Sequence, residues 1–481
     1  MKLPSLYRIA WIFLAGFHLG AAPLHAFGHN RLSKSDPDKV LSIDRVVRVA
    51  FPKMNNQAIG MRAKTPHNQF AEARDISFIP RFHGTRELVT KDGIDFAVFR
   101  VRLYSPGAKS LNIGFSKYHM PKGGSLHVYS ATGNQEIRAF TDEDNDEHGQ
   151  LWTPILETDE VVVEADVPLD SLDFLRLEIA KVNHGFKRLD APDADSPLDK
   201  SVGGENHVSG SCNVDVACSE GNTWRRQINS VAVYSIDGTL NCTGSAINNV
   251  SNNNRPFFLT ANHCQVDASN APSVVAYWNF QNSLCRTAGS APSGAAGDGT
   301  LTEFNTGTYF RAANATSDFT LLEFDDPINP QSKVFLAGWD RTTTNPASAV
   351  SIHHPGIAEK RISIDKNALS PSTYGVDISP GDGTHWRVGK WDEGVTESGS
   401  SGAPLFNPQG LIIGQLHGGF SKCGMSDLRD WYGRFSVSWT GNGTAATRLS
   451  NWLDPTGTGV TSIPGKEVNS SIVPVLTLLL N

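Results

Sequence analysis

Residues 1–211 contain no cysteine, and all six cysteines of the 481-residue sequence lie from Cys212 to Cys423. None of them belongs to a Cys-x-x-Cys pair, which argues against a structural zinc site. The 42 basic residues are outnumbered by 49 acidic ones, so the basic surface of a nucleic-acid-binding protein and a cationic membrane helix are both missing. Solenoid-type repeats are missing too.

Long apolar runs are equally scarce. Ile9–Ala22 is apolar but shorter than the roughly 20 residues of a membrane helix, and it follows Lys2 and Arg8 and precedes the small residue Ala26. This order is typical of a secretory signal peptide, which we place at residues 1–26, with a buried N-terminal helix as the alternative. Export through the Sec pathway would make the protein extracellular, where six cysteines favour disulfides. Their spacing alone does not select the pairing.

Residues 27–206 contain short stretches of alternating apolar residues separated by turns such as Pro106-Gly107. Alternation of this kind indicates half-buried antiparallel strands, so we expect a small β-sandwich. From about 187 to 206 the sequence is polar and rich in proline, glycine and serine, which predicts a linker. The alternating positions are Ile94, Phe96 and Val98; Leu111, Ile113 and Phe115; Leu126 and Val128; and Leu175, Leu177 and Ile179.

The second half contains three residues that fit a nucleophilic site. His263 follows the apolar run Phe257–Ala261, Asp318 precedes another apolar run, and Ser401 lies in a loop of small residues. A serine hydroxyl becomes a nucleophile when an imidazole accepts its proton and a buried carboxylate orients the imidazole. The chain order His, Asp, Ser is the order of chymotrypsin-like proteases. Separations of 55 and 83 residues suit three separate loops.

Glycine at position 399 fits the same chemistry. The negative charge that forms on a substrate carbonyl needs two convergent N–H groups, and those of Gly399 and Ser401 are the candidates for this oxyanion hole. A side chain at 399 would hinder the backbone conformation that turns its N–H inward. The chemistry needs no metal or organic cofactor. His353 and His354 do not suggest one, because adjacent residues of a strand point to opposite faces.

Longer motifs surround these residues. They include GSCNVDVAC, LTANHC, YWNFQNSLC, ATSDFTLLE, HHPGIAEKRIS, SGSSGAPLF and GQLHGG. Through them residues 207–463 resemble the lysyl endopeptidases secreted by bacteria, a branch of the trypsin-like serine proteases. The resemblance implies an all-β domain of two antiparallel six-stranded β-barrels of chymotrypsin type, which leaves a C-terminal tail over 464–481. It also implies three disulfides: Cys212–Cys423, Cys218–Cys285 and Cys242–Cys264.

The resemblance also indicates which side chain is recognised. Trypsin carries an aspartate six residues before its nucleophile, but Val395 holds that place here. Asp430 lies where the family has its lysine-binding aspartate, and a substrate ammonium would relieve the cost of burying that carboxylate. Pairing of Asp430 with Arg429 or Arg434 at the surface is the alternative. Asp427 and Asp392 are weaker candidates for the same role.

The segment Gln415–Gly419 is expected to form the wall that pairs with the substrate backbone, which makes His417 and Gly418 candidate substrate-binding residues. Family members often stack a tryptophan on the histidine at this place. Alignment puts Asp377 at the tryptophan position, and Trp386 is the candidate substitute.

We therefore expect a secreted, monomeric serine endopeptidase that cleaves proteins or peptides after lysine, with no metal, cofactor, nucleic acid or membrane partner. Ser400 replaces the aspartate with which pancreatic enzymes bind a newly freed N-terminus, so control is expected from the first domain, a propeptide that assists folding and blocks the cleft. Lys200-Ser201 is a candidate self-cleavage site, although the family's usual mature start aligns near His207. One alternative is a protease of this type that prefers arginine or glutamate. The other is a secreted β-protein without catalytic activity.

Overall fold

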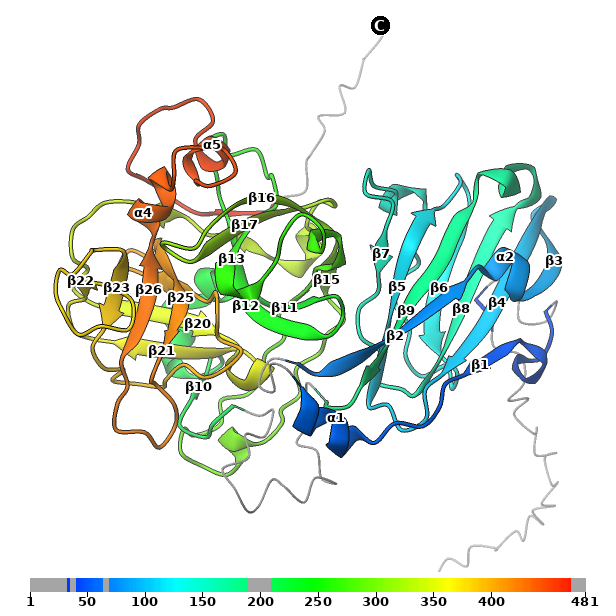
Figure 1. Ribbon diagram of the computed structural model, residues 1–481, viewed down its shortest axis with the longest axis horizontal. Helices are drawn as coiled ribbons and strands as arrows, with labels where there is room; N and C mark the ends of the chain where they lie inside the picture. Colours follow the sequence, from blue (N-terminus) through cyan, green and yellow to red (C-terminus); the bar gives the residue numbers. More distant parts are fainter. Residues whose placement is uncertain (1–32, 35–39, 64–68, 189–208, 469–481) are drawn as a thin grey trace, which may run out of the picture.

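The computed structural model describes residues 33–34, 40–63, 69–188 and 209–468, which form two β-rich domains (Figure 1). We call residues 40–188 the N-terminal domain and residues 209–468 the C-terminal domain. The expected signal peptide, most of the expected linker and most of the expected tail lie outside the described residues, as do Lys200, Ser201 and His207. Within the described ranges, no helix has the length and apolar character needed to cross a bilayer.

The N-terminal domain is a sandwich of two sheets. One sheet has the strand order β1-β4-β8-β6 with β3 beside β4, and the other has the order β2-β9-β5-β7. Neighbouring strands are antiparallel except β1, which runs parallel to β4. The strands are β1 Arg48–Ala50, β2 Ala71–Phe78, β3 Thr85–Lys91, β4 Ile94–Tyr104, β5 Ser110–His119, β6 Ser125–Ser130, β7 Leu151–Trp152, β8 Glu160–Pro168 and β9 Arg176–Gly185.

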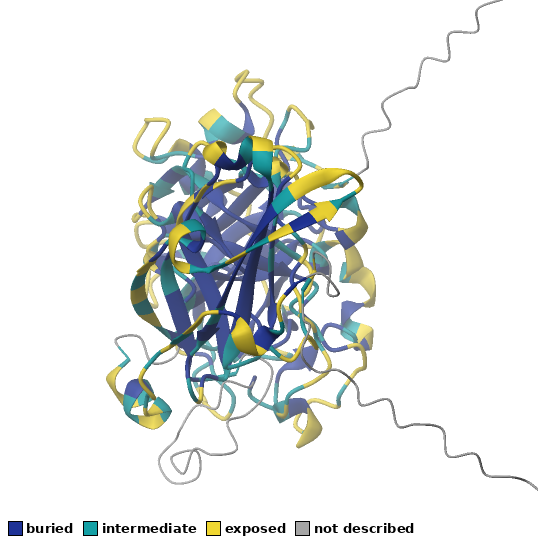
Figure 2. Cartoon of the chain, turned by 90° about the vertical axis from the view of Figure 1, so that its right-hand side faces the viewer, coloured by how far each residue is buried: buried dark blue, intermediate teal, exposed yellow. Residues whose placement is uncertain are grey.

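Apolar side chains fill the space between the two sheets, where Figure 2 shows the buried residues. The predicted inward faces of β5, β6 and β9 enter this core. The prediction for β4 is wrong, because Ala97, Phe99 and Val101 form its core face, while Ile94 is 54% exposed. Val98 packs on the outer face against Val40, in a segment that covers this side of the strand. Apolar residues therefore occur on both faces of β4, and alternation located the strand without identifying its inner face.

The C-terminal domain contains two large sheets. The first has seven strands in the order β15-β14-β11-β12-β13-β17-β16, and the second has ten strands built around β21-β20-β24-β25-β26-β23. The first comprises β11 Val231–Ile236, β12 Leu240–Ile247, β13 Phe257–Ala261, β14 Val275–Trp278, β15 Phe304–Thr306, β16 Thr308–Asn314 and β17 Phe319–Phe324. The second comprises β10 Val214–Asp215, β19 Trp339–Asp340, β20 Ala349–His353, β21 Arg361–Asp365, β22 Ser370–Ser372, β23 His385–Val388, β24 Pro404–Phe406, β25 Ile412–Gly419, β26 Asp430–Arg434 and β27 Ser462–Ile463.

This is the expected all-β arrangement of two antiparallel sheets. The second sheet exceeds six strands because short segments such as β10, β22 and β27 add to it, and the first has the three-residue β15 at its edge. Strand pairing also continues past 463, since β28 (Lys466–Glu467) pairs with β18 (Phe335–Leu336). The start of the expected tail is thus part of the folded domain.

Helices are few and short. The α-helices are α1 Asn56–Arg62, α2 Pro80–His83, α3 Arg225–Ile228, α4 Phe435–Thr440 and α5 Ser450–Leu453. The 3-10 helices are η1 Ile43–Arg45, η2 Asp142–Asp144, η3 Leu169–Phe174, η5 Ser219–Trp224, η6 Asn262–Cys264, η7 Ala271–Ser273, η8 Pro292–Gly294, η9 Pro330–Ser332 and η10 Pro355–Ile357.

Three disulfides join Cys212 to Cys423, Cys218 to Cys285 and Cys242 to Cys264, the pairing that the resemblance implies. The third closes a loop of 22 residues between β12 and the turn after β13. In the chain-entropy view, a link of this size stabilises the fold by about 3 kcal/mol.

The N-terminal domain docks on the first sheet of the C-terminal domain, at the turn between β11 and β12. The Phe70 N–H donates to the Thr239 carbonyl at 3.0 Å, and Asn112 Nδ2 donates to the Gly238 carbonyl at 3.0 Å. Gly238 has φ +61°, and a Cβ there would lie 2.0 Å from Asn112 Oδ1. Only glycine therefore fits this turn between the domains.

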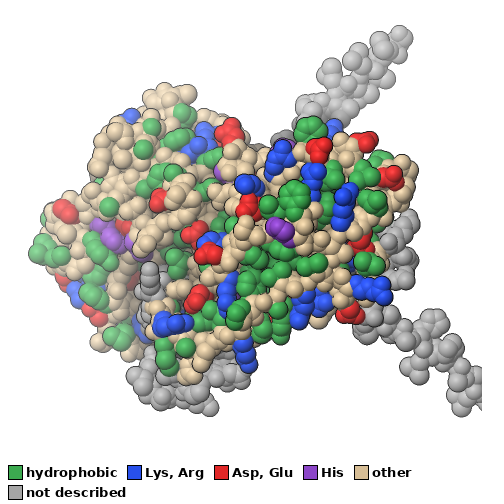
Figure 3. Space-filling view, turned by 45° about the vertical axis from the view of Figure 1, so that its right-hand side comes forward, with side chains coloured by type: hydrophobic (Ala, Val, Ile, Leu, Met, Phe, Trp, Pro, Cys, Tyr) green, Lys and Arg blue, Asp and Glu red, His purple; other side chains and the backbone are tan. Residues whose placement is uncertain are grey.

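A shared apolar cluster continues the interface. Its members are Phe70, Ala71, Trp152 and Ile155 from the N-terminal domain and Val233, Val275, Tyr277, Phe280 and Ile357 from the C-terminal domain. On the face drawn in Figure 3, basic, acidic and apolar side chains are interspersed over the N-terminal domain.

Candidate active site

His263 is held by the end of a buried strand. All five residues of β13 are buried, and the chain turns at η6, which contains His263 and ends at Gln265 with φ +64°. The disulfide from Cys264 to Cys242 ties this turn to β12. The imidazole is thereby fixed beside the first sheet while its ring remains about one-third exposed.

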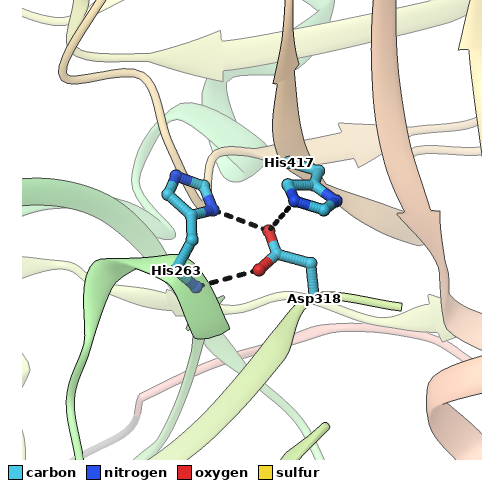
Figure 4. A group of neighbouring side chains, drawn as sticks. All are labelled: His263, Asp318 and His417. Atoms are coloured by element: carbon cyan, nitrogen blue, oxygen red, sulfur yellow. Dashed lines mark hydrogen bonds and ion pairs between the residues drawn. The ribbon is translucent and has the colours of Figure 1, made fainter. Parts of the chain in front are cut away.

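Asp318 lies directly before β17, the neighbour of β13. Its Oδ1 accepts the backbone N–H of His263 at 2.9 Å, and its Oδ2 lies 2.7 Å from His263 Nδ1. Figure 4 shows both contacts. Because a carboxylate only accepts hydrogen bonds, Nδ1 carries the proton and Nε2 is free to act as a base.

Ser401 completes the chain of hydrogen bonds, with its Oγ 2.8 Å from His263 Nε2. Its carbonyl accepts the Thr243 N–H at 2.9 Å, and the Gly399 carbonyl accepts Thr243 Oγ1 at 2.8 Å. Strand β12 thus fixes the loop on both sides of Ser400. The structure brings His263, Asp318 and Ser401 together in the geometry that sequence spacing predicted for a triad.

Gly399 has φ +91°, and a Cβ there would lie 2.7 Å from the backbone nitrogen of Ile357. Within the described chain, neither the Gly399 nor the Ser401 N–H donates a hydrogen bond to the protein, as an oxyanion hole requires. Ser400 instead bonds to its surroundings, with Oγ 2.8 Å from His353 Nδ1. The Ser400 hydroxyl therefore takes part in the hydrogen bonds that hold this loop.

Asp430 begins β26 and is only 1% exposed. Its Oδ2 accepts three neutral donors, namely Trp391 Nε1 at 2.6 Å, Thr396 Oγ1 at 2.8 Å and Ser421 Oγ at 2.6 Å. Its Oδ1 has no hydrogen-bond partner. Burial raises the pKa of Asp430, although the three donors oppose the shift. A buried carboxylate is thus left with one oxygen unsatisfied.

The surface alternatives for Asp430 are wrong. Arg429 pairs with Asp427 at 2.6 Å and with Asp377 at 3.1 Å, while Arg434 Nη1 donates to the Gly383 carbonyl. Asp427, a weaker candidate for the lysine-binding residue, is thereby already paired with Arg429. Asp392, the other weaker candidate, accepts the Lys366 N–H at 2.7 Å in an exposed loop.

Strand β25 carries His417, Gly418 and Gly419 and pairs with β26, so that Gly419 faces Asp430. A Cβ at 419 would lie 2.0 Å from Asp430 Oδ1. Glycine at this place keeps the space next to that oxygen free of a side chain. The two predicted walls, 415–419 and 429–434, therefore meet at the buried carboxylate.

Tyr374, which sequence reasoning missed, covers His417. The two rings stack with centroids 3.6 Å apart and an interplanar angle of 7°. The expected substitute, Trp386, is instead buried under Arg434, and Asp377 pairs with Arg387 and Arg429. Alignment could not find Tyr374, because it reaches His417 from a different position in the loop after β22.

Two groups of side chains approach metal-binding geometry. His263, Asp318 and His417 bring ligand atoms within 4.8 Å of one another, as do Asp146, His148 and Asp325. In the first group, the proton of His263 Nδ1 already lies between the ring and Asp318. His353 is fully engaged, with its two ring nitrogens bonded to Ser400 and Ser363, so its role is structural.

Comparison with known proteins gives matches to two domains of one family. The lysyl endopeptidase C-terminal domain matches residues 206–433, and the lysyl endopeptidase N-terminal domain matches residues 89–186. A lysyl endopeptidase of Pseudomonas aeruginosa is 28% identical over 328 residues, which cover 64% of this chain and 66% of that protein. The chain thus spans just under two thirds of this relative's length.

Among solved structures, the inactive form of the Rv3671c protease of M. tuberculosis is 16% identical and covers 46% of this chain and 91% of its own, with a TM-score of 0.30. A thermostable serine protease, AL20, from an extremophilic microorganism is 11% identical and covers 44% of this chain and 92% of its own, with a TM-score of 0.31. Scores this low carry no inference about the site.

The fold and the site define a serine peptidase of chymotrypsin type. Within that class the chain belongs to the lysyl endopeptidase family, whose two domains match it over about two thirds of its length.

Proposed function

We propose that this chain is an endopeptidase that cleaves peptide bonds on the carboxyl side of lysine. Ser401 Oγ attacks the substrate carbonyl while His263 Nε2 takes its proton and later gives it to the leaving amine. Asp318 orients the imidazole and stabilises its charged form. The N–H groups of Gly399 and Ser401 hold the negative oxygen of the tetrahedral intermediate.

The 2.7 and 2.8 Å contacts of His263 with Asp318 and Ser401 support the first steps. A neutral His263 with its proton on Nδ1 is already the correct tautomer for a general base. The free N–H groups of Gly399 and Ser401 support their role as the oxyanion hole, because they need no rearrangement before negative charge develops on the substrate oxygen.

The observation that carries the lysine preference is the unpartnered oxygen of Asp430. A buried carboxylate is costly without a cation, and a substrate ammonium would supply one. Gly419 and Gly418 would then face the substrate backbone as the edge of β25. His417 does not favour an acidic side chain, because burial lowers its pKa to about 4 and leaves it neutral.

The same geometry favours lysine over arginine. Three donors already occupy Asp430 Oδ2, so only Oδ1 remains for a ligand. A guanidinium binds a carboxylate best through two parallel hydrogen bonds, whereas an ammonium is a compact charge that needs one oxygen. This argument selects between the two cationic preferences that the sequence left open.

Cleavage of short peptide amides that end in Lys, Arg, Glu or Phe tests the proposal, with Ser401→Ala as the control. We expect strong preference for Lys, and a loss of about 10⁴-fold or more in kcat for Ser401→Ala. Labelling of Ser401 by a fluorophosphonate separates the enzyme from a non-catalytic β-protein. Labelling together with cleavage after Glu or Phe would discard Asp430 as the specificity residue.

We further propose that the N-terminal domain is a propeptide of this enzyme. The docked turn leads directly into β12, whose Thr243 contacts the backbone of Ser401. Among the described residues of the N-terminal domain, no hydrogen bond or ion pair reaches His263, Ser401 or Asp430, so the proposed control of the site would act through the docked turn and β12.

N-terminal sequencing of the active enzyme tests this role. We expect a start near the linker, at about 200–207, and little activity before cleavage. Active enzyme in which both domains are still covalently joined would exclude a propeptide. The signal peptide over 1–26, secretion through the Sec pathway, and a monomeric state belong to the same proposal, and mass spectrometry with size-exclusion chromatography of the secreted protein checks them.

A further inference from the structure

A second imidazole lies beside the proposed triad. The ring of His417 stacks on that of His263, with centroids 5.5 Å apart. Its Nε2 lies 3.9 Å from Asp318 Oδ2, the oxygen that already binds His263 Nδ1 (Figure 4). On its other side, His417 Nδ1 lies 3.0 Å from His385 Nε2. Which nitrogen of His417 carries a proton therefore matters to Asp318.

A chain of hydrogen bonds that starts at Asp382 determines the answer. Asp382 Oδ1 accepts the Thr384 backbone N–H at 3.0 Å and the Thr384 hydroxyl at 2.7 Å. Although partial burial acts to raise it, the hydrogen bonds from Thr384 hold the pKa of Asp382 below its usual value. The group is therefore a carboxylate, which can only accept. The single hydroxyl proton of Thr384 is thus committed to Asp382.

Since that proton is committed, Thr384 Oγ1 must accept from His385 Nδ1, which lies 2.7 Å away. A neutral His385 with its proton on Nδ1 has a lone pair on Nε2. His385 Nε2 then accepts the proton of His417 Nδ1. His417 Nε2 is left as a lone pair that points toward the oxygens of Asp318 without donating to them.

Both histidines stay neutral over the working range of a protease. Burial lowers the pKa of His417 to about 4 and that of His385 to about 4. The groups that face His417 are Asp318 before β17, His263 in η6, His385 on β23 and the stacked ring of Tyr374. The direction of the hydrogen bonds is therefore fixed at neutral pH.

We infer that His385 is a positioning residue, which fixes the tautomer of His417 so that His417 cannot donate to Asp318. The inference rests on the proposed function, because it matters only if Asp318 orients His263 during catalysis. With His417 unable to donate, the side chain of His263 has no competitor for Asp318 Oδ2. If the proton of His417 moved to Nε2, a slight tilt of the ring would let it compete for Oδ2. The bond that orients the base would then be weakened in the transition state, where its charge is largest.

Nitrogen NMR of histidine-labelled full-length protein tests the inference, because it reads the tautomer without reference to activity. We expect the wild type to have His417 protonated at Nδ1. His385→Phe keeps a ring but removes the acceptor, and it should move a measurable share of His417 to the Nε2–H form. Thr384→Val breaks the chain of hydrogen bonds one step earlier. It should produce the same change in the tautomer of His417 and serves as the test if His385→Phe fails to fold. Thr444→Val, at an exposed threonine that bonds only to Thr447, is the matched control.

Kinetics on lysine peptides give the second readout. We expect kcat to fall about tenfold in His385→Phe while KM stays unchanged, because His385 acts through His417 on a bond that matters most in the transition state. A wild type with its proton on Nε2, or a His417 tautomer unaffected by both variants, would overturn the inference. A wild type that cleaves no lysine peptide would instead contradict the proposed function and leave the tautomer result standing.

Discussion

Buried charges of the N-terminal domain and Asp430 of the C-terminal domain are neutralised in different ways. In the N-terminal domain, the buried Arg100 pairs with Glu87 at 2.6 Å, and the buried Asp166 pairs with Lys91 at 2.8 Å. In the C-terminal domain, Asp430 is equally buried and, like Asp166, has one oxygen without a hydrogen-bond partner, yet within the described chain it forms no ion pair. Charges that are paired within the protein stabilise its structure, whereas an unpaired carboxylate reserves a place for a cation from outside.

The C-terminal domain also contains a paired carboxylate that makes a matched comparison. Asp215 is buried and pairs with Arg286 at 2.7 Å and with Arg361 at 2.8 Å. The two aspartates share their burial and their domain and differ in their partners. Exchanging each for asparagine should therefore separate a binding role from a structural one.

Asp430→Asn should reduce kcat/KM on lysine amides by about 10³-fold, because it removes the buried partner of the substrate ammonium. Stability should not fall. Burial raises the pKa of Asp430, so the contribution of this group to stability is full at low pH and is lost as pH rises through that raised pKa. Asparagine escapes this loss, and thermal unfolding at pH 5 and pH 8 should show the variant gaining relative to wild type at the higher pH.

Asp215→Asn should do the reverse. It leaves two arginines with less compensation, at a cost of about 3–5 kcal/mol in the free energy of unfolding. The ratio of kcat/KM for Lys over Arg should stay unchanged in the folded fraction. Denaturant unfolding together with the same amide assay checks both points. A variant that loses specificity but not stability would mean that the two aspartates do not differ as their partners indicate.

The interface between the domains shows a third arrangement, in which acidic groups of both domains face one another. Asp146 and His148 of the N-terminal domain lie against Asp325, with His148 Nε2 2.8 Å from its Oδ2. Arg138 lies 3.7 Å from Asp326. Burial, with the charge of Asp325 added, raises the pKa of Asp326 to about 7 and that of Asp146 to about 6.

Docking of the two domains should therefore weaken as pH rises. Groups whose pKa is raised in the docked state favour docking fully below their ordinary pKa of about 4, and they lose this contribution as pH rises through 6 to 7. In a Ser401→Ala chain with a cleavable site added to the linker, co-elution after cleavage should be stronger at pH 5.5 than at pH 8. Asp326→Asn should flatten this dependence. A pH-independent elution of the unsubstituted pair would show that the acidic groups do not control docking.

The smallest effect is expected at Tyr374. Aromatic stacking contributes about 0.5–1.5 kcal/mol beyond burial, so Tyr374→Ala should lower kcat/KM by about two- to tenfold. Tyr374→Phe keeps the stacked ring and should be close to wild type. Steady-state kinetics of the three proteins give the comparison, and a Phe variant as impaired as the Ala variant would assign the effect to the hydroxyl.

Sequence alone predicted the parts that depend on short motifs. His263, Asp318 and Ser401 lie at the ends of apolar strands, and the sequence positions of such strands are readable. The inner face of β4 was not readable, because the segment around Val40 covers its outer side. Ring contacts such as that of Tyr374 on His417 depend on the path of a loop, and no periodicity encodes it.

The same limit explains why His385 and Asn112 were missed. Each acts through a partner that is distant in the chain, His417 and Gly238 respectively, and each belongs to a residue type that is common on protein surfaces. Asp430 was found through resemblance. Its decisive property, an oxygen without a partner, emerged only when Trp391, Thr396 and Ser421 were seen on the other oxygen.

The most direct test of the unpaired carboxylate compares two substrates that differ only in charge. Amides that end in lysine and in norleucine, which has a similar apolar stem and no ammonium, are assayed with wild type and Asp430→Asn. We predict that the wild type prefers lysine by about 10³-fold and that the variant loses nearly all of this preference, a coupling of roughly 4 kcal/mol. Equal preference in both proteins would contradict the account, because the ammonium would then be recognised elsewhere.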